Sequence, residues 1–84
     1  MRFYYITFRS VTHAQRAENL LEAHDIRCSL QRTPRWMEVQ GCGYALRVWA
    51  KEPETSLNLL KKQGIPMRRL YLQDIGGELE ELNL

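Results

Sequence analysis

Residues 2–8, Arg-Phe-Tyr-Tyr-Ile-Thr-Phe, are the stretch that decides the fold. The stretch is aromatic and β-branched and contains no Gly or Pro, which is the composition of a strand. Because successive side chains of a strand alternate, apolar groups fall on both faces: Phe3 and Tyr5 on one, Tyr4, Ile6 and Phe8 on the other. Each face of this strand therefore needs something to cover it.

The segments that follow switch between helical and strand periodicity. Thr12, three residues before Gln15, is a capping-box signal for a helix start, and Gly64 stands where a helix C-terminal cap is expected. Pro53 fits the first position of a second helix. The predicted elements are strands over 2–8, 26–31, 44–49 and 67–72, and helices over about 12–24 and from Pro53 towards Gly64.

This order, β-α-β-β-α-β, predicts an α+β domain of the ferredoxin-like kind over residues 1–72. Right-handed crossovers place both helices on one face of a four-stranded antiparallel sheet, with strands 2–8 and 44–49 in its centre. Residues 73–84 form a C-terminal tail with four acidic residues and no Lys or Arg. We expect this tail, as a short amphipathic helix carrying Leu79 and Leu82, or a second subunit in a homodimer, to cover the other face.

Size and composition limit the function. A chain of 84 residues builds a thin core and no deep cleft of its own, which favours a carrier over a free-standing enzyme. No apolar run is long enough to span a membrane, and the N-terminus lacks the pattern of a signal peptide. Two cysteines are too few for a disulfide scaffold, so we expect a cytoplasmic protein with reduced thiols.

Cys42 is the sharpest feature, because its neighbours Gly41 and Gly43 leave the sulfur easy to approach. Positive charge favours the reactive thiolate, and the arginines close in sequence are Arg32, Arg35 and Arg47. The alternative is a tight entry to a strand in which Cys42 only fills space. Cys28 alternates with Ile26 and Leu30, which predicts that it points into the core.

The residues give little support for metal binding, cofactor binding or RNA binding. No C-x-x-C or H-x-x-x-H pair is present, so no metal and no cofactor is predicted, and His13 and His24 are expected on the surface. Residues 42–49 match the third-strand motif of RNA-recognition domains at Gly43, Tyr44 and Ala45. The leading basic residue and one stacking aromatic are missing, which argues against nucleic-acid binding.

Four segments together resemble a known family: "YYITFRSVTHAQRAENLLEAHDI", "TPR", "GCGYALRV" and "SLNLLKKQGI". The chain resembles the DUF3343 family of small bacterial proteins, described as selenium/sulfur carrier protein-like, over about residues 4–72. The resemblance implies that Cys42 is the carrier cysteine and that Gly43 is the glycine following it.

Two functions remain as hypotheses. A carrier holds sulfur or selenium as a persulfide-type adduct on Cys42 and exchanges it with donor and acceptor proteins, with Gly41, Gly43, Arg35 and Arg47 around the thiol. The alternative is a small regulatory or ligand-binding module without thiol chemistry, because this fold hosts many unrelated functions.

Overall fold

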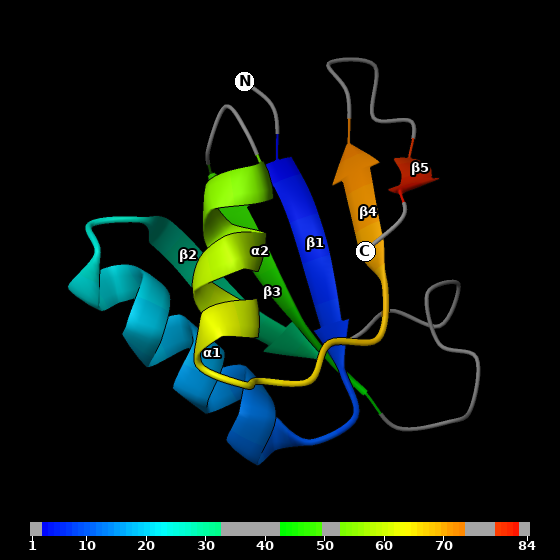
Figure 1. Ribbon diagram of the computed structural model, residues 1–84. Coiled ribbons are helices and arrows are strands. Elements are labelled where there is room, and N and C mark those ends of the chain that lie inside the picture. The colour runs from blue at the N-terminus through cyan, green and yellow to red at the C-terminus, as the bar shows by residue number, and fades with distance from the viewer. Residues whose placement is uncertain (1–2, 33–42, 50–52, 74–78, 83–84) are drawn as a thin grey trace.

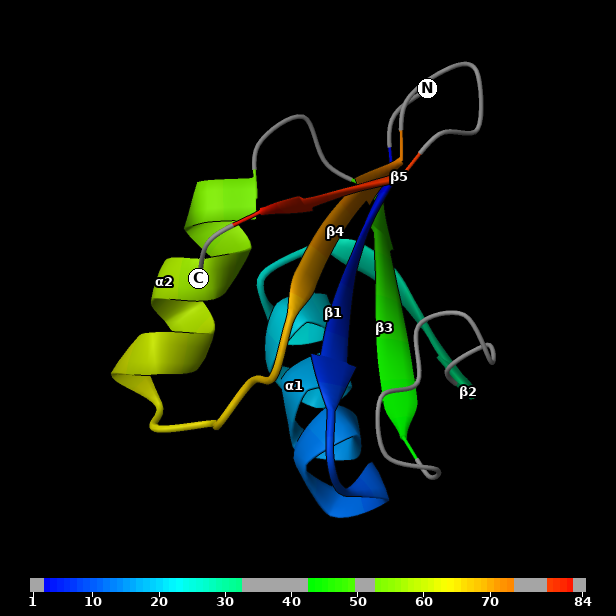
Figure 2. The same ribbon diagram turned by 90° about the vertical axis from the view of Figure 1, so that its right-hand side faces the viewer.

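The computed structural model describes residues 3–32, 43–49, 53–73 and 79–82 (Figure 1). Five strands form one sheet in the order β2-β3-β1-β4-β5, and all neighbouring strands are antiparallel. Both helices lie on the same face of this sheet (Figures 1 and 2). The elements are β1 (Phe3–Phe8), α1 (Val11–Ala23), β2 (Arg27–Arg32), β3 (Tyr44–Trp49), α2 (Pro53–Lys62), β4 (Leu70–Gln73) and β5 (Leu79–Leu82).

The α+β class, the two helices and the antiparallel sheet are confirmed, but the prediction of four strands is wrong. Leu79–Leu82 form β5, which pairs with the outer edge of β4 in the register Leu70↔Leu82. The expected tail helix is therefore also wrong over these residues. A short segment gains few hydrogen bonds as an isolated helix, whereas the free edge of β4 offers it a row of backbone partners.

The main core lies between the sheet and the helices. Tyr4, Ile6 and Phe8 of β1 are fully buried there, as the alternation of the strand predicts. The Tyr4 hydroxyl lies 3.0 Å from Ser56 Oγ of α2, so this buried phenol has a polar partner. The helices, β3 and β4 contribute the other fully buried side chains of the cluster: Ala14, Ala17, Leu21, Leu46, Val48, Leu60 and Leu70.

The ends of both helices follow from local hydrogen bonding. Ser10, not Thr12, is the N-cap of α1, and its side chain accepts from the Thr12 amide at 3.1 Å. Both helices end in a Schellman motif, in which two successive amides after the helix donate to carbonyls of its last turn. Asp25 and Gly64 occupy the left-handed position of this motif, at φ 60° and 69°. The glycine was expected in this position, whereas the aspartate was not.

The fourth strand begins later than the sequence pattern predicts. Residues from Met67 were expected to be extended and paired, but β4 begins at Leu70. Just before it, the Arg68 amide donates to the Thr7 carbonyl at 2.8 Å, and the Arg69 amide donates to Thr7 Oγ1 at 3.0 Å. Two residues thus face one residue of β1, an arrangement typical of a β-bulge.

We predict that Leu82→Ala lowers the free energy of unfolding by about 1–2 kcal/mol, because Leu82 is half-buried and packs against the main core from β5. Glu80→Ala is the matched control on the same strand, where the side chain is exposed, and should change stability by less than about 0.5 kcal/mol. Urea denaturation measures both. Equal effects of the two substitutions would show that β5 adds nothing to the core.

Candidate functional site

The predicted thiol site is described only in part. Cys42, Gly41 and Arg35 lie outside the described residues. Gly43 is buried and directly precedes β3, whose first residue, Tyr44, pairs with Phe8 at the end of β1. Arg47 lies in the middle of β3. The assignment of a carrier thiol to Cys42 therefore stays a prediction.

Arg47 belongs to a cluster on the sheet face opposite the helices. Its guanidinium carbon lies 5.2, 5.5 and 5.7 Å from the ring centroids of Phe3, Tyr5 and Trp49. Its Nε donates to the Tyr5 hydroxyl at 3.1 Å, and that hydroxyl donates to Gln73 Oε1 at 3.1 Å. The Arg47 side chain is thus held by cation–π contacts and one hydrogen bond.

This cluster explains how an apolar sheet face is covered in part. Tyr5 is only 7% exposed, and Ala45 beside it is buried. Phe3 and Trp49 meet edge to face, with ring centroids 5.4 Å apart. The described rings therefore pack against one another and against Arg47, which leaves less of their faces for stacking nucleic-acid bases.

Cys28 lies on the helix side of β2, partly buried against the main core as the sequence predicted. Its Sγ donates a weak hydrogen bond to the Glu18 carbonyl at 3.8 Å. Burial, followed by the negative charges of Glu22 and Glu18, raises the pKa of the Cys28 thiol to about 11. Cys28 is therefore a poor nucleophile at neutral pH.

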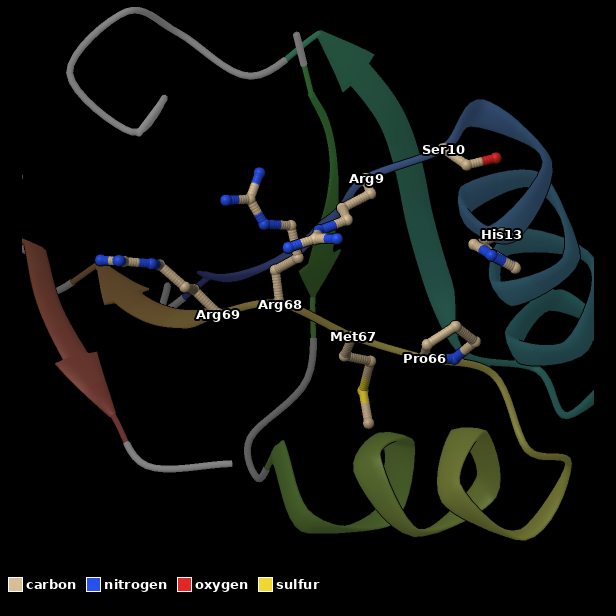
Figure 3. Close-up of a pocket in the computed structure, with 7 residues that line it drawn as sticks. All are labelled: Arg9, Ser10, His13, Pro66, Met67, Arg68 and Arg69. Carbon is tan, nitrogen blue, oxygen red and sulfur yellow. The ribbon is translucent and has the colours of Figure 1, made fainter. Parts of the chain in front are cut away.

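A cavity of about 560 Å³ opens at the end of the sheet where β1 leads into α1 (Figure 3). Basic side chains dominate its wall, and none of the described residues that line it is a carboxylate. The lining comes from the residues after β1, the first turn of α1 and the segment before β4: Arg9, Ser10, His13, Pro66, Met67, Arg68 and Arg69. Gly43 and the start of β3 lie at this same end of the sheet, because Tyr44 pairs with Phe8.

A family model described as "Putative Se/S carrier protein-like" matches residues 3–72. The chain belongs to this family. The match spans β1 to β4 and includes both the predicted thiol segment and the cavity. No curated protein and no solved structure matches the chain significantly.

Two further findings concern metal sites and membrane-spanning helices. Within the described ranges, no three His, Cys, Asp or Glu side chains gather as a metal site would require. Neither α1 nor α2 is long and apolar enough to cross a membrane.

Sequence reasoning missed the cavity. Arg9 is far in the chain from the adjacent pair Arg68 and Arg69, and the three form no basic run, so no local pattern joins them. His13 was expected on the surface, but it is only partly exposed and its Nδ1 is buried. The sequence did contain one signal for the cavity: Arg9 and Ser10 stand between the end of a predicted central strand and the start of a predicted helix.

We predict that Arg47→Gln lowers the free energy of unfolding by about 1–2 kcal/mol, because it removes contacts with three rings and the hydrogen bond to Tyr5. Arg27→Gln is the matched control. Arg27 is exposed, and its one cation–π contact within the described ranges is with the Trp49 ring at 5.2 Å, so the loss should stay below about 0.5 kcal/mol. Chemical denaturation at fixed pH compares them. If Arg47→Gln is as harmless as its control, the ring cluster does not hold the open face together.

Proposed function

We propose that this chain is a carrier that holds sulfur or selenium as a persulfide-type adduct on Cys42 and passes it between partner enzymes. The observation that carries the proposal is the family match over residues 3–72, which includes the segment around Cys42. The family's description names a Se/S cargo, and a single nucleophilic thiol is the simplest group that binds such cargo covalently.

The two cysteines of the chain support assigning this role to Cys42. A thiol must ionise to attack a sulfur atom, and the pKa of Cys28 is about 11. At pH 7 only on the order of one Cys28 side chain in ten thousand is a thiolate. Cys42 is the other cysteine in the sequence, and it stands between two glycines. If the chain performs thiol chemistry at neutral pH, Cys42 is the better candidate.

The proposed transfer needs no external oxidant. The Cys42 thiolate attacks the terminal sulfur of a donor protein's persulfide, a new S–S bond forms, and the donor's S–S bond breaks to release its cysteine as a thiolate. Cys42 then carries the persulfide. In the second step an acceptor nucleophile attacks the terminal sulfur and releases the Cys42 thiolate. Selenium follows the same scheme, with a selenium atom in the terminal position.

A ligand-binding module without thiol chemistry is the second candidate function. The cationic cavity at the end of the sheet favours it, because small-molecule sites are concave and carry a few polar groups that fix the ligand. The two functions differ in their dependence on Cys42. Small-molecule binding in the cavity survives the loss of the thiol, whereas carrier activity does not.

We predict that treatment with a low-molecular-weight persulfide donor, such as cysteine persulfide, adds one sulfur atom to the wild-type chain and to Cys28→Ser. Cys42→Ser should stay unmodified, because its remaining thiol is protonated at neutral pH. Intact mass spectrometry, with and without a reductant, measures the adduct. A sulfur adduct on Cys42→Ser, or none on Cys28→Ser, would contradict the carrier assignment.

The pH dependence of alkylation supplies the control. In Cys42→Ser, the rate at which iodoacetamide alkylates Cys28 should rise about tenfold for each pH unit until the pH nears 11, since only the thiolate reacts. A plateau near pH 8 in this variant would show that Cys28 is an ordinary accessible thiol, and the argument by elimination would fail.

A further inference from the structure

The cavity lined by Arg9, His13 and Arg68 contains positive charge that the described part of the chain does not neutralise. Arg69 has a carboxylate partner, because its Nη1 lies 3.0 Å from Glu81 Oε1 of β5. Arg9 and Arg68 have no carboxylate partner among the described residues. In the view of Figure 3 these two side chains lie next to each other, on the side away from His13, whereas Arg69 points towards β5.

The backbone that carries these arginines is fixed to the central strand. Arg68 N donates to the Thr7 carbonyl at 2.8 Å, and Thr7 N donates to the Arg69 carbonyl at 2.9 Å. Arg69 N donates to Thr7 Oγ1 at 3.0 Å. Arg9 directly follows Phe8, which is fully buried. Because both segments are anchored before any ligand arrives, binding would cost little backbone ordering.

The first turn of α1 adds hydrogen-bond donors to the same wall. The N-terminus of a helix carries partial positive charge and amides that have no partner within the helix. The first turn of this 13-residue helix contains no acidic residue to offset that charge. Ser10, its N-cap, uses its side chain on the Thr12 amide. Ser10 and His13 line the cavity, so the partial positive charge of the helix end lies beside it.

His13 is a further residue of the cavity wall. Its Nδ1 is buried with no hydrogen-bond partner among the described residues, so this nitrogen does not face the cavity and is not counted as a ligand-binding atom. The His13 side chain, two arginines that have no carboxylate partner among the described residues, and a helix N-terminus thus border one cavity.

We propose that this cavity binds a phosphate-class oxyanion, a tetrahedral dianion that is either free or the terminal group of a small molecule. Two guanidinium groups match the charge of a dianion and offer forked donors to its oxygens. The volume of about 560 Å³ is larger than a free phosphate needs and lies in the range of small-molecule sites. The inference rests on residues 9–13 and 66–69 and not on Cys42, so it is independent of the carrier proposal.

The test measures the binding of inorganic phosphate to the full chain by isothermal titration calorimetry at constant ionic strength, because screening would otherwise obscure differences between variants. Arg9→Gln and Arg68→Gln should each weaken binding roughly tenfold, as expected for the loss of a charge-assisted hydrogen bond. Arg16→Gln is the matched control, since Arg16 is an exposed arginine of α1 outside the cavity lining. It should change affinity by less than about twofold.

Parallel titrations with glycerol phosphate and acetate define the ligand class. Glycerol phosphate binding tighter than inorganic phosphate identifies an esterified ligand, and equal affinities identify a free oxyanion; either result supports the proposal. Amide shifts in the first turn of α1 on adding phosphate would place the ligand. Absence of saturable phosphate binding, acetate affinity equal to that of phosphate, or equal weakening by Arg16→Gln would overturn it.

Discussion

Thr7 of β1 is joined to the backbone of Arg68 and Arg69 by three hydrogen bonds of 2.8–3.0 Å. This contact ties the segment that enters β4 to the most deeply buried strand of the sheet. Thr7 itself is 5% exposed, so the bonds form where water competes little for them. Arg9 follows Thr7 by two residues at the end of the same strand. One central strand therefore fixes both cavity arginines that have no carboxylate partner among the described residues.

The two faces of the sheet separate two kinds of chemistry. The helix face is apolar, and burial there, reinforced by two nearby glutamates, keeps the Cys28 thiol protonated. On the open face, Arg47 spreads its charge over three aromatic rings. The cavity lies at one end, beside the entry to β3 that follows Gly43. The placement of Arg9 and Arg68 at the cavity and the protonated thiol of Cys28 thus come from the same packing that stabilises the sheet.

The parts of the fold that follow from local pattern were predictable from the sequence. The β-like run Tyr44–Trp49, which begins directly after Gly43, matches the bounds of β3, and Pro53 marks the first residue of α2. The strand pattern of 2–8 also assigns Tyr4 and Tyr5 to their correct faces. The expected burial of Cys28 followed from the same alternation.

Features that depend on distant partners were not predictable in this way. β5 forms because β4 has a free edge, and Leu79–Leu82 shows no strand pattern of its own. The late start of β4 depends on Thr7, more than 60 residues away, whose carbonyl and hydroxyl each accept a bond. The cavity joins arginines from two such distant segments. The thiol site at Cys42 lies outside the described residues, so its geometry stays a prediction.

Native-state hydrogen exchange tests most directly whether β1 fixes the cavity. The amides of Thr7, Arg68 and Arg69 should exchange only through global unfolding, with the same free energy and denaturant dependence as the Ile6 amide in the middle of β1. Exchange of the Arg68 and Arg69 amides through a local opening, at a clearly lower free energy than Ile6, would contradict a preformed cavity anchored to the central strand.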